Sequence, residues 1–173
     1  MLIRPSENEY LPAAQTYIDL VPDGNLLEIL KSQMEQTKRL LAGLSEQQSL
    51  FKYAQDKWTI KSVVGHISDV ERLWNYRILR IVRNDVRELP GYDRDVFAQE
   101  APFHDMALQD VMDDMVAVRM STLTLLHPLP ESVFIRYGEF NGQRLSARAA
   151  AYIIAGHEAH HMNVIRTRYI PNL

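Results

Sequence analysis

The 173-residue sequence contains no cysteine, which excludes disulfide bonds, thiolate metal ligands and a cysteine nucleophile. It has no apolar run approaching the ~18 residues that can span a bilayer, and its first ten residues meet charge and proline before the apolar part of a signal peptide could develop. Neither sign of charge dominates, because 19 lysines and arginines stand against 22 aspartates and glutamates. These absences predict a cytoplasmic protein that binds no nucleic acid and no membrane.

Apolar side chains make up 46% of the sequence, so a chain of this length can build a hydrophobic core. We expect a single domain over residues 1–173. Three prolines and Gly24 fall within residues 1–24. This density of turn-forming residues predicts an extended N-terminal arm lying over the domain rather than a first helix.

Four later segments repeat apolar side chains in steps of three and four, the pattern of a helix that buries one face. Asn25, Thr59 and Ser146 stand where the N-caps of the first, second and fourth helices are expected, and Asp105 precedes the third. The sequence therefore predicts an all-α, four-helix bundle. The apolar positions of the expected helices run over residues 27–44, 63–81, 108–125 and 150–165.

The chain between the third and fourth helices has a different pattern. Residues 133–137 and 143–145 flank the dipeptide Asn141-Gly142, which is typical of a tight two-residue turn between strands. We therefore expect a short hairpin or extended excursion at residues 132–145.

The most informative residues are His157 and His161 on the fourth helix. Side chains four residues apart are offset by about 40° around a helix and roughly 6 Å along it, so the two imidazoles can share one metal ion. The best third ligand is His66 on the second helix, which would face the pair across the ion. A single His66 would more often be a hydrogen-bonded residue at the edge of the core, and only the matched pair favours a ligand.

The other three histidines are not expected to bind this ion. His160 is within helical reach of His157, but it lies about 100° from His161 and should flank the site. His104 and His127 stand beside predicted helix ends, where surface and capping roles are usual.

Two carboxylates near the histidines leave alternatives open. Glu158-x-x-His161 matches one of the two Glu-x-x-His motifs that a di-iron bundle needs. The match is incomplete, because the second helix supplies His66-x-x-Asp69 and no glutamate one turn from His66. Asp69 could orient a ligand, bind the ion itself or lie solvated on the helix surface, and we favour the first of these. Asp69 and Glu158 are both weak candidates, either for orienting a ligand or for acid–base catalysis.

Four blocks occur in order along the chain: YAQDKWTI (53–60), GHISDVER (65–72), LPGYD (89–93) and IAGHEAHH (154–161). Together they resemble the DinB-like superfamily of metal-dependent proteins, which includes the bacillithiol and mycothiol transferases. The resemblance implies an up-down-down-up four-helix bundle and frequent homodimers. It also implies a three-histidine metal site, which here would be His66, His157 and His161.

Three neutral imidazoles with open coordination positions are typical of a catalytic metal site, and zinc or nickel suits them best, with iron and manganese as alternatives. The first hypothesis is a thiol-dependent S-transferase, in which the ion lowers the pKa of a small-molecule thiol that attacks an electrophile. The second is a hydrolase that uses a metal-bound hydroxide, with Asp69 or Glu158 as proton acceptor. The third is a non-catalytic, stress-related metal-binding dimer.

Overall fold

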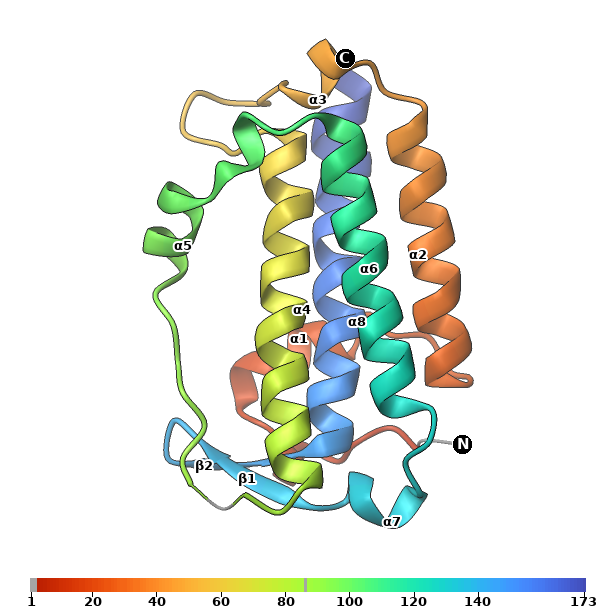
Figure 1. Cartoon of the computed structure of the whole chain (residues 1–173), viewed down its shortest axis with the longest axis vertical. Helices are drawn as coiled ribbons and strands as arrows, with labels where there is room; N and C mark the ends of the chain where they lie inside the picture. The colour runs from red at the N-terminus through yellow and green to blue at the C-terminus, as the bar shows by residue number, and fades with distance from the viewer. Residues whose placement is uncertain (1–2, 86) are drawn as a thin grey trace.

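The computed structural model of the chain describes residues 3–85 and 87–173. Its framework is a set of four long helices that lie side by side along the longest axis of the molecule (Figure 1). They are α2 (Leu26–Ala42), α4 (Ile60–Val82), α6 (Leu108–Leu126) and α8 (Ala147–Val164). The predicted all-α, four-helix bundle is confirmed.

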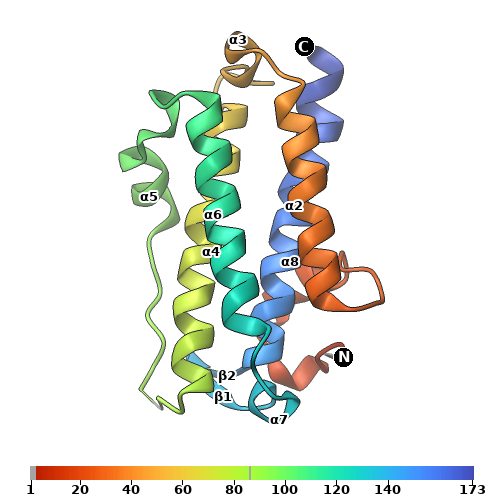
Figure 2. The same cartoon turned by 45° about the vertical axis from the view of Figure 1, so that its right-hand side comes forward.

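The long helices run up, down, down and up in chain order, as the resemblance implied (Figure 1). The first connection carries the short helix α3 (Glu46–Ser49) and turns the chain at one end of the bundle, so α4 is antiparallel to α2. The second connection returns along the outside of the bundle with α5 (Arg94–Glu100) and a 3₁₀ turn, η3 (Pro102–His104). Because this crossover spans the length of the bundle, α6 runs parallel to α4 (Figure 2). We refer to the end that carries α3 as the α3 end.

The third connection lies at the opposite end and contains the expected hairpin (Figure 1). Strands β1 (Tyr137–Phe140) and β2 (Gln143–Ser146) pair antiparallel around Asn141 and Gly142, which have φ angles of 51° and 71°. Two successive positive φ angles are the mark of a type I′ turn. The excursion is not extended throughout, because residues Glu131–Phe134 form the helical turn α7, which buries Phe134 in the core.

Side-chain caps fix the beginnings of three long helices. The Asn25 side chain accepts a hydrogen bond from the backbone N–H of Leu27, and Thr59 accepts one from Ser62. Ser146 accepts one from the backbone N–H of Ala149. These contacts satisfy N–H groups that have no partner within the helix, and the three predicted N-caps are confirmed.

Residues 3–24 form the predicted arm, which lies against α8. The arm contains no long helix, but it is not extended throughout. It folds into two 3₁₀ turns, η1 (Glu7–Glu9) and η2 (Pro12–Ala14), and a single α-helical turn, α1 (Gln15–Ile18). The first turn is closed by a capping box between Ser6 and Glu9, and the second has Pro12 at its first position, where proline favours a helical start.

Two clusters of buried apolar side chains fill the bundle, one toward the hairpin and one toward the α3 end. After α8 the chain continues through a π-helical turn (Ile165–Tyr169) and a 3₁₀ turn, η5 (Ile170–Asn172). Within residues 3–85 and 87–173, no helix has the length and apolar character needed to cross a membrane. The histidines of interest lie on α4 and α8, within the half of the bundle nearer α3.

Candidate metal centre

The antiparallel packing of α4 against α8 brings His66, His157 and His161 together. One ring nitrogen from each histidine can be chosen so that all three lie within 4.8 Å of one another. The Nε2 atoms of His157 and His161 are 3.1 Å apart. Nitrogens bound to one tetrahedral zinc at 2.0–2.1 Å would be about 3.3 Å apart. The spacing of this pair, one helical turn apart on α8, therefore suits two ligands of one ion.

His66 and His157 are buried and His161 is half-buried, and this sets their protonation. Burial, with a smaller contribution from the positive charge of Arg94, lowers the pKa of His66 to about 4. Burial lowers the pKa of His161 to about 3, with His66, His160 and Arg94 acting in the same direction. Burial and the neighbouring histidines also hold the pKa of His157 well below its usual range. The three imidazoles are neutral near pH 7 and present lone pairs, which a divalent ion requires.

His160 is not part of this cluster. It is exposed, and its ring packs edge-on against Tyr17 of the arm at a centroid distance of 5.6 Å. His104 and His127 are also exposed and lie at the end of η3 and at the C-cap of α6. His160 also contacts the ring of His161 at a centroid distance of 5.0 Å, but the group whose ring nitrogens lie within 4.8 Å of one another consists of His66, His157 and His161.

A glycine precedes the histidine on each helix of the centre and lets a covering segment approach. A Cβ atom at Gly65 would lie 2.2 Å from the ring of Phe103, which comes from the crossover. A Cβ atom at Gly156 would lie 2.0 Å from the backbone oxygen of Tyr17 in the arm. Because no side chain could occupy these spaces, the two glycines allow the crossover and the arm to pack directly beside the histidines.

The centre borders a cavity of about 440 Å³, with His161 in its wall. Three aromatic side chains, Tyr53, Trp58 and Tyr169, line it, and the Tyr169 hydroxyl donates a 2.9 Å hydrogen bond to the Trp58 carbonyl. The Trp58 ring also contacts His66 at a centroid distance of 4.9 Å. The cavity therefore combines aromatic faces with access to the histidine cluster.

Comparison with known proteins assigns the chain to a family. The model of the DinB superfamily matches residues 29–165, a span that includes α4, α6, α8 and all of α2 except its first three residues. The chain belongs to the DinB superfamily. This membership confirms the resemblance that the four sequence blocks indicated.

A solved structure supports the same fold for this DinB-superfamily chain. YfiT from Bacillus subtilis, described as "a probable metal-dependent hydrolase with an unusual four-helix bundle topology", superposes with a TM-score of 0.68. The two chains are 16% identical, and the match covers 95% of this chain and 93% of YfiT. At this identity the likeness shows the fold alone. No curated protein sequence matches the chain significantly.

Asp69 lies near His66 but has another partner. It lines a small cavity beside His66, and it accepts a 3.4 Å hydrogen bond from Arg72, which also binds Asp114. Burial raises the pKa of Asp69; Arg72 opposes this shift and Asp114 adds to it. The role of Asp69 in orienting a ligand stays a prediction.

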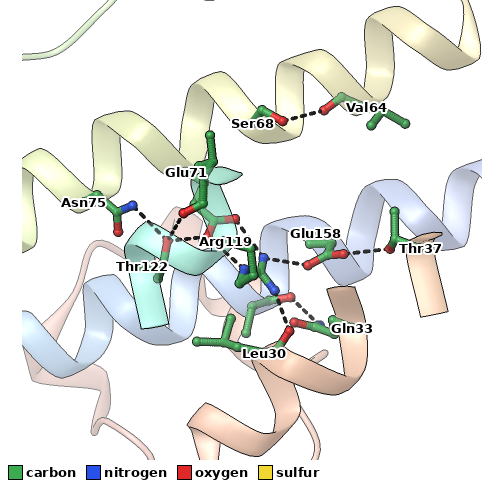
Figure 3. Close-up of polar contacts among 12 residues, drawn as sticks. Leu30, Gln33, Thr37, Val64, Ser68, Glu71, Asn75, Arg119, Thr122 and Glu158 are labelled. Carbon is green, nitrogen blue, oxygen red and sulfur yellow. Dashed lines mark hydrogen bonds and ion pairs between the residues drawn. The ribbon is translucent and has the colours of Figure 1, made fainter. Parts of the chain in front are cut away.

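Glu158, the other carboxylate proposed to orient a ligand or to act in acid–base catalysis, does not line this cavity. Its Oε1 atom accepts a 2.7 Å hydrogen bond from the Thr37 hydroxyl, and its Oε2 atom accepts one of 2.6 Å from Arg119 (Figure 3). The side chain is buried in the middle of the bundle. With both oxygens engaged there, the contacts of Glu158 do not favour acid–base catalysis at the histidine cluster.

Sequence reasoning missed the partners of Glu158. Arg119 of α6 forms ion pairs with Glu158 of α8 and Glu71 of α4. The available signal was position: Arg119 follows Met115 by four residues, so it falls on the apolar stripe of its helix. A charged residue on a buried stripe predicts an opposite charge on a facing helix.

Proposed function

We propose that this DinB-superfamily chain is a metal-dependent enzyme that transfers a small-molecule thiol to an electrophile, with zinc or nickel held by His66, His157 and His161. The observation that carries the proposal is the convergence of three neutral imidazoles, within 4.8 Å of one another, beside a cavity of about 440 Å³. When bound, the ion would supply the Lewis acidity that lowers the pKa of a coordinated thiol.

The donor set fits a catalytic ion. Three protein ligands leave at least one position for an exchangeable ligand, whereas structural zinc sites are closed by four. The cavity volume lies in the ordinary range for small-molecule sites. Its aromatic walls, Tyr53, Trp58 and Tyr169, offer apolar faces to a substrate.

The distribution of carboxylates favours a thiol over water as the nucleophile. Asp56 and Asp95 line the cavity, but each is paired with a neighbouring cation, Lys57 and Arg94 respectively. Glu158 is held by Arg119 and Thr37. Asp69 lines a separate small cavity beside His66 and accepts a hydrogen bond from Arg72. A thiol loses its proton far more readily than water does and has less need of a carboxylate base.

The nucleophile must come from outside the chain, because the sequence has no cysteine. In the proposed reaction the thiol releases its proton to solvent. The sulfur electron pair forms the new S–C bond while the leaving group departs with the electron pair of its bond to carbon. A haloalkane or haloarene is a suitable test electrophile.

Hydrolysis is the second candidate, and the similarity to YfiT favours it, because YfiT is described as a probable metal-dependent hydrolase. Water would then be the nucleophile at the same three histidines. Steady-state rates with and without thiol, in wild type and His161→Ala, separate the candidates. Thiol-dependent turnover that His161→Ala abolishes supports transfer. Thiol-independent turnover that the same variant abolishes supports hydrolysis instead.

Absence of metal-dependent turnover across both substrate classes would favour the third hypothesis, a non-catalytic metal-binding protein. The homodimer that the superfamily resemblance implies stays a prediction, and sedimentation equilibrium of the purified chain tests it.

A further inference from the structure

A ring of buried polar contacts joins all four long helices (Figure 3), and one of its members, Glu158, directly follows His157 in the sequence. Arg119 of α6 is its hub: Nε and Nη2 donate hydrogen bonds of 2.8 and 2.7 Å to the two carboxylate oxygens of Glu71 on α4. Nη2 also donates one of 2.6 Å to Glu158 on α8, and Nη1 donates one of 2.8 Å to the Leu30 carbonyl on α2. Thr37 of α2 completes the ring with its hydrogen bond to Glu158.

The charged members are almost fully buried, with exposed fractions of 2% for Arg119, 4% for Glu71 and 2% for Glu158. Charges buried in this way contribute little net stability compared with apolar side chains of the same size. Their hydrogen bonds are strongly directional, because the planar guanidinium meets Glu71 with two parallel bonds. The ring therefore contributes geometry more than stability.

The ring of polar contacts around Arg119 involves the same parts of α4 and α8 that carry the histidines. Glu158 directly follows His157 on α8, and Glu71 lies five residues after His66 on α4. Around a helix, Glu158 points about 100° from His157 and about 60° from His161. When Glu158 meets Arg119, the two histidines are turned toward α4 and His66.

Small rotations of α8 would disturb the centre. A ring nitrogen about 6 Å from the helix axis moves by roughly 1 Å when the helix turns by 10°. Metal–ligand distances tolerate only about 0.2 Å. A device that fixes the rotation of α8 against α4 and α6 is therefore needed to hold three histidines from two helices on one ion.

We propose that Glu158, held by Arg119 and Thr37, is a positioning residue that fixes the rotation of α8 and so aims His157 and His161 at the ion bound with His66. This inference rests on the proposed metal-binding function. It extends that function to a side chain that touches neither the ion nor the cavity.

Two variants of Glu158 separate position from charge. Glu158→Gln keeps the length and removes the charge; Glu158→Asp keeps the charge and shortens the side chain by one methylene. Both should weaken Co²⁺ binding by about 10- to 100-fold, the usual effect of losing a group that orients a ligand. Both should also change the visible d–d spectrum of the Co²⁺ protein. Wild-type Co²⁺ affinity in both variants would overturn the inference. Wild-type affinity in Glu158→Asp alone would also overturn it, because the negative charge would then be enough and the length of the side chain would not matter.

Two further variants control for stability. Ile78→Ala removes a fully buried side chain in the core cluster toward the hairpin, so it should lower the melting temperature while leaving Co²⁺ affinity and spectrum unchanged. Thr37→Val removes only the hydrogen bond to Glu158 and should weaken Co²⁺ binding several-fold, which keeps the inference testable if the Glu158 variants do not fold. Wild-type affinity in folded Thr37→Val protein would count against it.

A readout without metal distinguishes failure of this inference from failure of the proposed function. Long-range ¹H–¹⁵N spectra of the metal-free protein report on the rings of His157 and His161, whose Nε2 atoms are 3.1 Å apart. Glu158→Gln should change these correlations. If wild-type protein does not bind Co²⁺, the metal function fails but altered ring correlations still support positioning; unaltered correlations overturn it.

Discussion

Two buried polar clusters lie next to each other in this bundle, and they are built in opposite ways. In the first, His66, His157 and His161 are neutral and converge without a charged partner. In the second, Arg119 and two glutamates are charged, and each carboxylate oxygen accepts a hydrogen bond. The satisfied cluster has no capacity left for a ligand, whereas the neutral cluster retains lone pairs. Groups that converge and keep free lone pairs can bind a metal ion, whereas groups that are fully paired with one another fix the arrangement of the helices.

The satisfied cluster should be the more costly one to break. Arg119→Met leaves Glu71 and Glu158 buried without their cation, and loss of one partner from a buried charge pair costs about 3–5 kcal/mol of unfolding free energy. Urea denaturation measures the effect. The matched control is Arg87→Met, the same substitution in an exposed ion pair with Asp85, which should hardly change the transition. Equal midpoints for the two variants would contradict the distinction.

The histidine cluster should stabilise the fold only when a metal is bound. A ligand specific to the folded state adds about 4 kcal/mol at a thousandfold excess over its Kd. Chelation should therefore lower the melting temperature clearly without abolishing the fold, because the two apolar clusters remain. An unchanged melting curve, in protein shown to contain metal before chelation and none after it, would argue against an ion that bridges α4 and α8.

The packing of the arm beside His157 depends on Gly156. In Gly156→Ala the new methyl group would overlap the backbone oxygen of Tyr17, so the arm must shift, at a cost of about 1–3 kcal/mol. Gly91→Ala is the control, because no atom of residues 3–85 and 87–173 lies within 4 Å of the added methyl group. Thermal melts compare the two, and limited proteolysis of the arm should be faster only in Gly156→Ala. Equal protease resistance would show that the arm does not need this close approach.

The arm should make a pH-dependent contribution to the free energy of unfolding through Glu9. The Glu9 side chain is 1% exposed and pairs with Arg148. Burial raises the pKa of Glu9, but hydrogen bonds from Arg148 and Ser6 outweigh this and bring it to about 2, below the usual 4.5. The folded state therefore binds its proton less readily than the unfolded state. The stabilisation is complete above about pH 4.5 and is lost as the pH falls toward 2.

The variant Glu9→Gln isolates this contribution. It should be less stable than wild type by about 1–3 kcal/mol at pH 7, and the difference should shrink as the pH falls from 4.5 to 2. Denaturation curves across this range measure it. A difference that stays constant with pH would contradict the role of the Glu9 charge.

The long helices could be predicted from sequence because each has its own apolar period, and three carry a capping side chain whose chemistry is local. The histidine cluster was predictable for a related reason, since His157 and His161 are neighbours on one helix. Helix α5 was missed because Val96 and Phe97 stay exposed and no buried stripe marks it. Only Asp93, which caps it through the backbone N–H groups of Asp95 and Val96, hinted at a helix.

The ring of polar contacts around Arg119 could not be predicted from the sequence in the same way. Arg119, Glu71 and Glu158 are each ordinary residues within their own helices, and their meaning depends on which helices face each other. That pairing is fixed by the up-down-down-up order, which the sequence indicated only through its resemblance to a superfamily. The same limit explains why Glu158 was assigned to acid–base chemistry: its distance along the chain from His157 is short, but it points into a different part of the bundle.

Elemental analysis of untagged protein tests the central claim most directly, by comparing wild type with single alanine variants of His66, His157, His161 and His160. We expect one equivalent of a divalent metal in wild type and in His160→Ala, and loss of the metal in the other three variants. Metal retained without His66, or lost as completely from His160→Ala as from His161→Ala, would contradict the assignment of His66, His157 and His161 as the ligands.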